Sequence, residues 1–509
     1  MSTTATNSVK LGDLFSGLGE GMDTPLADLT VTDITTDSGR VIEGGLFLAC
    51  QGFSHHGLEF VQPSIAAGAK AIVWEPAEGR SAPDLPEGVA GFAVTDLGNR
   101  VGTIADRFFV QPSDQARVTG VTGTNGKTTT AWLVSQALGF LGRKTGYMGT
   151  LGYGIGSSLK PSALTTPGVI AVHRRLRELV DAGATAVIME VSSHGLDQGR
   201  LDAVRVRTAA FTNLSRDHLD YHADLAAYSE AKAKLFAMTS IENAVINVGD
   251  PFGAELVHNW HSDAQLIAVA LNDRAPAGVA VDLTADIVES NADGLLLQFA
   301  GRYGAAEMRS SLWGHFNAEN LLVATGILLA HGYDLQQATA ALENCESPSG
   351  RMQLVRAAAS APLVVVDFAH TPDALAQVLA VMRAHCSGAI SVVFGCGGER
   401  DKGKRGEMGS VAARLANRVI VTDDNPRNEN PDAIVAEILA GIADQGNVSV
   451  VRDRADAIAM AVAASGAADV VLVAGKGSEN YQLIAGRSVP FSDVAEATAA
   501  LAASTGRLA

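Results

Sequence analysis

Short runs of apolar, often β-branched residues recur along the chain and alternate with longer segments of helical periodicity. Runs of this length that are bounded by Gly, Pro, Asn or Asp are typical of buried strands. Strands that alternate with helices predict βαβ units and a mainly parallel sheet. The predicted strands are 46–49, 71–74, 91–94, 118–121, 186–191, 209–214, 244–248, 266–270, 363–368, 390–394, 418–422, 448–451 and 470–474.

The order of these elements divides the chain into three α/β segments. We place them at 1–111, 112–346 and 347–509, because the run Gln111-Pro112-Ser113 has the composition of a linker and a Pro-Ser-Gly-Arg run begins at 348. A chain of 509 residues is too long for one ordinary core, which agrees with about three domains. Residues 280–312 alternate more strictly and predict added antiparallel strands. The last segment has the regular alternation of a Rossmann-like domain.

A Gly-rich run between a predicted strand and a predicted helix has the context of a phosphate-binding loop. It reads Thr-Gly-Thr-Asn-Gly-Lys-Thr-Thr-Thr from 122 to 130, and an apolar helical pattern follows from 131 to 141. Backbone N–H groups at the start of such a helix attract anions. Lys127 is placed to reach the outer phosphates of a nucleotide, and the Thr128 hydroxyl to hold Mg²⁺. The spacing is unusual, since Val121 stands where the common form has its first glycine.

Polar clusters follow several predicted strands, at the ends where α/β sheets bind ligands. Glu190 ends one buried strand and is a candidate metal ligand, although a polar strand end is an equal alternative. His218 lies in a loop that holds two His and two Asp, and it too is a candidate ligand, or part of an ordinary polar loop. Taken alone, Lys232 and Lys234 have the pattern of a surface lysine pair.

Three further clusters follow three strands of the last segment. They are 400–405, 424–427 and 475–479. The first is a dense basic run, which by default forms a solvated face and alternatively binds anionic groups. Their shared position predicts that they meet at one edge of one sheet.

Composition narrows the class of protein. The net charge of −17 argues against a nonspecific nucleic-acid binder. The four cysteines form no C-x-x-C pair, which disfavours a zinc site or a disulfide framework. We find no signal-peptide pattern and no apolar run of the ~18 residues that span a bilayer. We therefore expect a soluble cytoplasmic protein without a membrane span. We also expect a monomer.

Taken together, these motifs resemble those of the Mur ligase family, and the resemblance covers nearly the whole chain. The motifs that carry it are 123–129, 190–196, 213–222, 314–320, 367–373, 395–405, 424–427 and 475–479. The resemblance implies an N-terminal UDP-binding domain, a central P-loop ATPase and a Rossmann-like C-terminal domain. It also implies that ATP activates a substrate carboxylate as an acyl phosphate, which an incoming amine then attacks. Phosphoryl transfer of this kind depends mainly on positioning and charge neutralisation.

The resemblance also implies roles for individual residues. Lys127, Glu190, His218 and Lys232 would be catalytic, with one Mg²⁺ held by Thr128 and a second Mg²⁺ by Glu190, His218 and a CO₂-derived carbamate on Lys232. ATP would contact Gly123, Thr124, Asn125, Gly126, Lys127, Thr128, Thr129, Asn317, Asn320, Arg351 and Asp367. A UDP-N-acetylmuramoyl-L-alanyl-D-glutamate substrate would contact Ser38, Thr165, Thr166, Ser192, Gln198 and Arg200, with the loop 52–57 completing the uridine pocket. A diaminopimelate substrate would contact Arg400, Asp424, Asn425, Pro426, Arg427, Gly475 and Glu479.

The run Asp-Asn-Pro-Arg at 424–427 resembles that of family members that add meso-diaminopimelate rather than lysine. Diaminopimelate has a second carboxylate, which an Arg fork such as Arg427 binds bidentately. Ser478 and Phe368 stand where the family usually has His and often has Tyr, and the 52–57 loop also departs from its pattern. The alternatives are a lysine-adding ligase, a folylpolyglutamate synthase-like ligase, the D-Ala-D-Ala-adding ligase and a P-loop switch that binds nucleotide without ligation.

Overall fold

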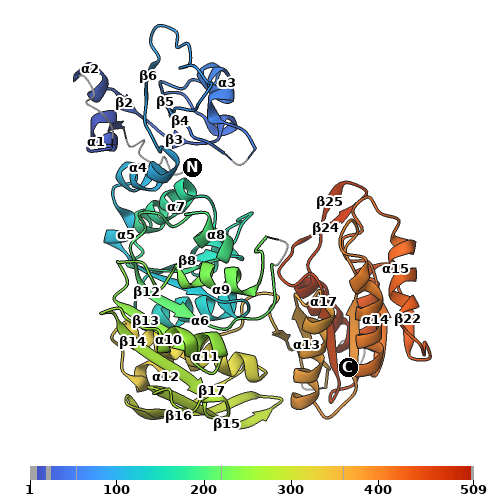
Figure 1. The fold of residues 1–509 in the computed structure, drawn as a ribbon. Helices are drawn as coiled ribbons and strands as arrows, with labels where there is room; N and C mark the ends of the chain where they lie inside the picture. The colour runs from blue at the N-terminus through green and yellow to red at the C-terminus, as the bar shows by residue number, and fades with distance from the viewer. Residues whose placement is uncertain (1–7, 19–23, 53, 219–220, 359, 506–509) are drawn as a thin grey trace. The chain divides into compact units, whose positions relative to one another are not determined.

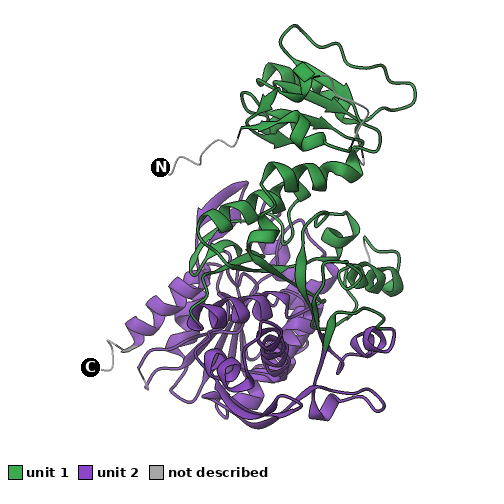
Figure 2. Ribbon diagram, turned by 90° about the vertical axis from the view of Figure 1, so that its left-hand side faces the viewer, with its two compact units in different colours: residues 1–124, 142–244, 260–266 green, residues 125–141, 245–259, 267–509 purple. Residues whose placement is uncertain are grey.

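A computed structural model describes residues 8–18, 24–52, 54–218, 221–358 and 360–505. By its internal contacts the chain forms two compact units, which Figure 2 shows in different colours. Unit 1 comprises residues 1–124, 142–244 and 260–266, and unit 2 comprises 125–141, 245–259 and 267–509. In both units helices alternate with strands, so the predicted α/β class is confirmed.

The N-terminal part of unit 1 is built on a parallel sheet with strand order β3-β4-β5-β6. Successive side chains of β4 point to opposite faces of this sheet. Leu46 and Leu48 pack in one apolar cluster, and Phe47 and Ala49 pack in another. The elements here are β1 (Val9–Lys10), α1 (Leu11–Phe15), α2 (Thr24–Ala27), β2 (Thr30–Val31), β3 (Ile34–Thr35), β4 (Leu46–Ala49), α3 (Val61–Ala66), β5 (Ala71–Trp74), β6 (Ala90–Ala93) and α4 (Val101–Phe108).

In the described residues of the remainder of unit 1, strands pair in the order β10-β9-β8-β11-β7-β12. Neighbouring strands among β8, β11, β7 and β12 are parallel, while β9 and β10 add an antiparallel edge. The elements are α5 (Pro112–Gln115), β7 (Arg117–Thr122), β8 (Thr145–Gly149), β9 (Gly152–Ile155), β10 (Ser158–Lys160), α7 (Val169–Asp181), β11 (Ala186–Glu190), α8 (Ser193–Asp197), β12 (Val206–Phe211) and α9 (Leu225–Ala233). Strand β13 (Asn243–Asn247) follows at the end of this stretch.

The run 111–113, which the sequence predicts as a linker, is not an extended segment. Pro112 and Ser113 are buried at the start of the short helix α5, with Pro112 in the first turn, where its missing N–H costs nothing. The Ser113 hydroxyl accepts a hydrogen bond from the Arg205 N–H at 3.0 Å. A Pro-Ser pair therefore begins a helix here rather than an open connection.

In unit 2, helix α6 (Lys127–Phe140) packs with α11 (His315–Ala330) and α12 (Leu335–Glu343). Strands β14 (Gln265–Leu271), β15 (Leu283–Asn291), β16 (Gly294–Gly301) and β17 (Gly304–Ser310) follow one another, and α10 (Pro251–His258) precedes them. The β15-β16 and β16-β17 pairs are antiparallel, which confirms the prediction for 280–312.

The C-terminal part of unit 2 has a sheet with order β18-β19-β23-β20-β21-β22, in which only β18 is antiparallel to its neighbour. Its helices cover both faces, since α13, α14 and α15 pack in one apolar cluster and α16 and α17 in another (Figure 1). The elements are β18 (Gln353–Val355), β19 (Leu363–Asp367), α13 (Pro372–His385), β20 (Ile390–Phe394), α14 (Gly403–Leu415), β21 (Arg418–Val421), α15 (Pro431–Ala440), β22 (Val448–Val450), α16 (Arg454–Ala463), β23 (Val470–Ala474), β24 (Tyr481–Ile484), β25 (Arg487–Pro490) and α17 (Asp493–Thr505).

Each predicted strand corresponds to an observed one, and the ends agree within one residue for most of them. The largest shift is at 209–214, where β12 is Val206–Phe211, with an irregular register between Val206 and Thr208. Among the described residues, no helix combines the length and apolar character that crossing a membrane requires.

Candidate active site

The Gly-rich run forms the predicted strand–loop–helix unit. Strand β7 ends at Thr122, Gly126 is the N-cap of α6, and Lys127 is the first residue of that helix. Gly123 has φ +148°, and a Cβ there would lie 1.9 Å from the Thr212 hydroxyl oxygen, so only glycine fits. The Thr124 N–H donates to the Asn213 carbonyl at 2.7 Å, and the Ser215 N–H donates to the Thr124 hydroxyl at 2.9 Å. The loop is thus braced by the segment that follows β12.

Lys232 lies directly against this loop. Its Nζ donates to the Gly123 carbonyl at 2.8 Å and lies 4.2 Å from the centre of the Tyr228 ring. The surface-pair interpretation is wrong for Lys232, which is 1% exposed, whereas Lys234 is exposed and pairs with Asp197 at 2.7 Å. A buried lysine beside a phosphate loop is a functional candidate, because burial of an ammonium costs free energy.

Tyr228 joins Lys232 to the loop. Its hydroxyl lies 3.2 Å from the Thr124 hydroxyl, and burial raises the pKa of Tyr228 to about 12. Tyr228 therefore stays neutral at physiological pH. It is a site residue to which the sequence alone assigned no role.

Glu190 is buried at the end of β11, and its carboxylate is held by three donors. One oxygen accepts from the Tyr147 hydroxyl and from the Thr150 N–H at 2.8 Å. The other accepts from the Thr150 hydroxyl at 3.1 Å. The two residues that supply these donors, Tyr147 and Thr150, lie in β8, the strand beside β11, and in the turn after it. The arrangement fixes an anionic group at the strand end, as a metal ligand requires.

The His-rich loop forms a cluster of rings with α8 and α9. His194 lies 5.0 Å from His218 and 4.1 Å from Tyr221 by ring centres. His222 Nε2 lies 3.0 Å from the Ser193 hydroxyl. His218 itself is half-exposed with φ +52°, and residues 219–220 of this predicted motif lie outside the described part of the chain. Where the structure describes the chain, no three His, Cys, Asp or Glu side chains converge as a metal site.

The structure brings the predicted muramoyl-dipeptide residues of unit 1 into one network beside Glu190. Thr166 accepts from the Ser192 N–H at 3.0 Å and donates to the Glu190 carbonyl at 3.0 Å. Arg200 donates to the Thr166 carbonyl at 2.7 Å and to the Gln198 side chain at 2.5 Å. Thr165 lies 3.0 Å from the Thr150 hydroxyl. Ser38 stands apart from this network, in the turn of Ser38–Arg40 after β3. In the loop 52–57, residue 53 lies outside the described residues.

Asn317 and Asn320 lie on α11 and connect it to α6. The Asn320 side-chain amide donates to Asn317 Oδ1 at 3.0 Å, and the Thr130 hydroxyl lies 3.4 Å from Asn320 Oδ1. Both asparagines are buried. Thr130, one turn after the loop, is a partner that the sequence analysis missed.

Arg351 and Asp367 meet at the start of the C-terminal sheet. Asp367 ends β19 and accepts from the Met352 N–H at 2.7 Å and the Ala369 N–H at 2.8 Å. Burial raises the pKa of Asp367, and these two hydrogen bonds oppose that rise. The Arg351 guanidinium lies 4.7 Å from the centre of the Phe368 ring, so the aromatic residue that departs from the family pattern is in contact with it.

The three polar clusters of the last segment follow β20, β21 and β23, which are parallel and include two neighbouring pairs. This confirms that they meet at one sheet edge. Asn425 donates to Glu479 at 2.8 Å, and the fully buried Lys476 donates to Asn425 at 3.1 Å and to Glu479 at 3.0 Å. Asp424 is buried nearby, and burial raises its pKa. Gly475 adjoins it, since a Cβ there would lie 3.5 Å from an Asp424 oxygen.

Arg427 follows Pro426 in this cluster and lies against the loop after β20. Its Nη1 donates to the Gly398 carbonyl at 2.6 Å. A Cβ at Gly397 would lie 3.0 Å from Arg427 Nη1 and 3.6 Å from Arg400 Cγ, so the two arginines flank this glycine. The solvated-face interpretation of the basic run is wrong for Arg405, whose side chain is fully buried with two glutamates.

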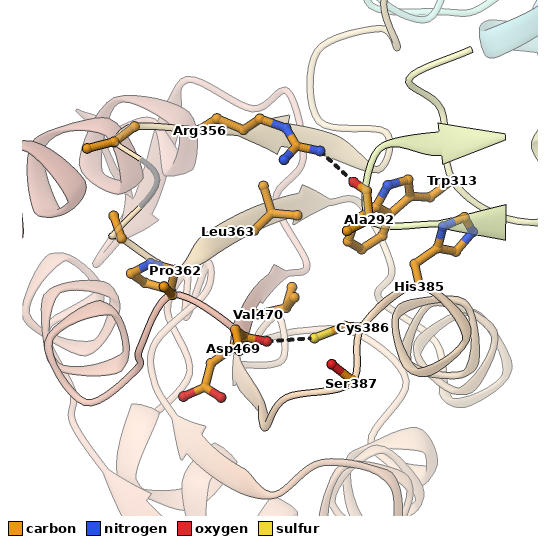
Figure 3. A pocket seen from close by; sticks show the side chains of 15 residues that line it. Ala292, Trp313, Arg356, Pro362, Leu363, His385, Cys386, Ser387, Asp469 and Val470 are labelled. Carbon is orange, nitrogen blue, oxygen red and sulfur yellow. Dashed lines mark hydrogen bonds between the residues drawn. The ribbon is translucent and has the colours of Figure 1, made fainter. Parts of the chain in front are cut away.

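A cavity of about 270 Å³ lies elsewhere in unit 2 and is shown in Figure 3. Its lining includes Leu363 and Val470, the first residues of β19 and β23. The motif residues follow the opposite ends of these parallel strands. The cavity is therefore not part of the candidate site.

Comparison with known proteins identifies the class. Three family descriptions match the chain: "Mur ligase family, catalytic domain" over residues 30–109, "Mur ligase middle domain" over 121–328 and "Mur ligase, glutamate ligase domain" over 350–477. The chain belongs to the Mur ligase family.

Several of its relatives share one name, UDP-N-acetylmuramoyl-L-alanyl-D-glutamate–2,6-diaminopimelate ligase. The protein of that name from Xanthomonas campestris is 48% identical over 94% of this chain and 95% of its own length. The one from Pseudomonas aeruginosa is 45% identical over 94% of this chain and 96% of its own length. A solved structure of a protein with this name is 34% identical, with a TM-score of 0.73 over 98% of this chain and 99% of its own. A Mycobacterium tuberculosis folylpolyglutamate synthase is 19% identical with a TM-score of 0.56 over 73% of this chain and 91% of its own, a likeness of fold alone.

Proposed function

We propose that this chain is an ATP-dependent ligase that joins meso-diaminopimelate to UDP-N-acetylmuramoyl-L-alanyl-D-glutamate, a step of peptidoglycan precursor synthesis in the cytoplasm. The observation that carries the proposal is the full-length similarity to diaminopimelate ligases at 45–48% identity. The placement of Arg427 beside Arg400 supports the choice of amino acid, because two guanidinium groups suit a carboxylate.

The reaction has two steps. One of the two free carboxylates of the D-glutamyl residue attacks the γ-phosphorus of ATP, which gives an acyl phosphate and ADP. The amine of diaminopimelate then attacks the acyl carbon, and inorganic phosphate leaves as the amide forms and the amine loses a proton. Lys127 and the N–H groups at the start of α6 would neutralise phosphate charge during the first step.

The proposed metal ligands are Thr128, Glu190, His218 and Lys232. Mg²⁺ bound there would draw charge from the phosphate oxygens. The donors fit a hard cation best if Lys232 bears a carbamate, because Mg²⁺ prefers oxygen ligands and an ammonium cannot coordinate. The fixed carboxylate of Glu190 and the contact of Lys232 with Gly123 support this assignment. Carbamylation adds CO₂ to the neutral amine of Lys232 and releases one proton.

The remaining assignments follow the same scheme. The network of Thr165, Thr166, Ser192, Gln198 and Arg200 would bind the muramoyl-dipeptide, and Ser38 the UDP end. The ATP adenine and ribose would lie near Asn317, Asn320, Arg351 and Asp367. We place the functional boundaries near residues 111 and 346, and we propose a monomer, which light scattering would test.

The decisive experiment measures ADP release with UDP-N-acetylmuramoyl-L-alanyl-D-glutamate, ATP and Mg²⁺, comparing meso-diaminopimelate with L-lysine. We expect turnover with diaminopimelate and not with lysine, because lysine has no second carboxylate to pair with the Arg427 guanidinium. Turnover with lysine would keep the ligase and overturn the selectivity. No turnover with either amino acid would overturn the proposal, and turnover with a folate acceptor would favour the synthase-like alternative.

The role of Arg427 has its own test. We expect Arg427→Ala to raise the KM for diaminopimelate at least about tenfold, since a charged hydrogen-bonded pair contributes roughly 1.5–3 kcal/mol. The KM for ATP should change little. Equal changes in both KM values would contradict the assignment.

A further inference from the structure

A buried ionic cluster lies behind the Arg427 loop and has no part in the proposed chemistry. Arg405, on α14, donates from Nη1 to Glu429 Oε1 and to Glu437 Oε2, each at 2.8 Å. Its Nη2 donates to Glu429 Oε2 at 2.9 Å and to the Gly397 carbonyl at 3.2 Å. The Arg405 side chain is fully buried, while the Glu429 side chain is 14% exposed. Arg405 therefore cannot contact a substrate in this structure.

Glu429 carries the effect of Arg405 to the loop after β20. Besides the two bonds from Arg405, Glu429 Oε2 accepts from the Glu399 N–H at 2.8 Å. The hydrogen bonds from Arg405 hold the pKa of Glu429 well below its usual range, so the carboxylate stays charged. Arg405 and Glu429 thus fix the backbone on both sides of Gly398, through the Gly397 carbonyl and the Glu399 N–H.

Gly398 is the residue that holds Arg427. Its carbonyl accepts from Arg427 Nη1 at 2.6 Å, and its N–H donates to the Asn425 carbonyl at 2.9 Å. A Cβ at Gly398 would lie 2.0 Å from the Pro426 carbonyl oxygen, which shows how closely the two loops approach.

The backbone of Arg427 is fixed independently. Its N–H donates to the Leu483 carbonyl at 2.8 Å, and its carbonyl accepts from the Ala485 N–H at 2.7 Å. With the main chain held on the β24 side, the direction of the guanidinium depends on the Gly398 carbonyl. The position of that carbonyl depends in turn on the Arg405–Glu429 pair.

We propose that Arg405, acting through Glu429, is a positioning residue for the carboxylate-binding Arg427 and thereby sets the selectivity for diaminopimelate. The inference rests on the proposed function. It requires arginine rather than a positive charge alone, because one planar guanidinium reaches two carboxylates and a carbonyl together. A lysine ammonium is a point charge and cannot reproduce that fork.

The test compares Arg405→Lys with the wild type in steady-state kinetics for each substrate. We expect the KM for diaminopimelate to rise about tenfold or more, with the KM values for ATP and the UDP-linked acceptor within about twofold. The preference for diaminopimelate over lysine should fall by a similar factor. Glu429→Gln should have the same effect, and the double variant should be no worse than either single variant, because both break one pathway.

Two variants serve as controls. Arg414→Lys changes an exposed arginine on the same helix and should leave all three KM values unchanged. Glu437→Gln removes a half-exposed partner that contacts Arg405 but not the loop, and should have a smaller effect than Glu429→Gln. A uniform fall in kcat for Arg405→Lys, with unchanged KM values and a lower Tm, would assign Arg405 a structural role only and overturn the inference. Failure of the wild type to use diaminopimelate would instead overturn the proposed function.

Discussion

The Glu190 carboxylate is oriented by individual hydrogen bonds. A carboxylate that already accepts from a hydroxyl and a backbone N–H keeps one orientation without a bound cation, which reduces the reorganisation needed on binding. Tyr147 and Thr150 supply those donors, and neither belongs to a motif that the sequence analysis singled out. Residues that orient a ligand carry ordinary side chains, so their role is visible only in three dimensions.

We expect Tyr147→Phe to lower kcat by about 10- to 100-fold, because it removes a hydrogen bond to a charged group. The variant should also need more Mg²⁺ for half-maximal activity. Tyr153→Phe is the matched control, since the hydroxyl of this β9 residue donates to Glu178 on helix α7 and not to Glu190. An unchanged Mg²⁺ dependence in Tyr147→Phe would contradict the orienting role.

Lys232→Ala should lower ADP release by more than about 100-fold, because it removes a buried group in contact with the phosphate loop. Lys234→Ala, two residues on and exposed, should retain activity. Native mass spectrometry of the intact, active protein should show a mass increase of one CO₂ that Lys232→Ala lacks. Full activity with an unmodified Lys232 would refute the carbamate.

At the scale of elements, β7, the loop and α6 depend on a glycine that the surrounding packing requires. Gly123 stands where a side chain would collide with Thr212 on the adjacent strand end. The loop is thereby brought close enough to β12 for Thr124 to bond the segment after it. The loop is therefore braced by the neighbouring segment, and the glycine in its own sequence makes that close approach possible.

Gly123→Ala should destabilise the protein by about 1–3 kcal/mol or more, since it adds backbone strain to a steric clash. Gly139→Ala provides the opposite case, because Gly139 is helical in α6 and a Cβ there meets nothing within 4 Å. That change should be neutral or stabilise by up to about 0.5–1 kcal/mol. Thermal unfolding of the two variants measures the difference, and equal Tm values would contradict the packing argument.

Periodicity was sufficient to predict most of the elements. The runs at 390–394 and 470–474 match β20 and β23 because buried central strands are apolar throughout and end at polar residues. The run at 209–214 was misplaced because the strand starts earlier, with the polar residues Arg207 and Thr208 inside it. The short helix that begins at Pro112 was not predicted, because proline and serine occur both in linkers and at helix starts.

Charged residues in the interior were the part that the sequence could not predict. Arg405 pairs with carboxylates that are 24 and 32 residues away in the sequence. Lys476 donates to Asn425, which is 51 residues away. A single sequence gives no sign that these partners meet, so a charged residue is assigned to solvent by default. The predicted strand ends located the site, but they did not show which side chains face a ligand and which support others.

For the whole molecule, the proposed reaction needs residues drawn from all three matched regions. We expect ADP release to fall to background when any one of ATP, the UDP-linked acceptor or diaminopimelate is omitted. Without the acceptor, no carboxylate is present to attack the γ-phosphorus. Without the amine, nothing attacks the acyl phosphate to complete the turnover. Sustained ADP release with ATP alone would favour an ATPase or a nucleotide switch instead.

The Arg427 guanidinium donates to a main-chain oxygen, so mutation affects this contact differently from a contact between two side chains. Substitution alters side chains and leaves the Gly398 carbonyl in place, while a side chain at that position would collide with the Pro426 carbonyl. An inhibitor that bound the same carbonyl in place of the guanidinium would therefore contact a feature with few routes of mutational escape. Resistance would have to arise from the supporting salt bridges, at the expense of the enzyme's own discrimination between amino acids.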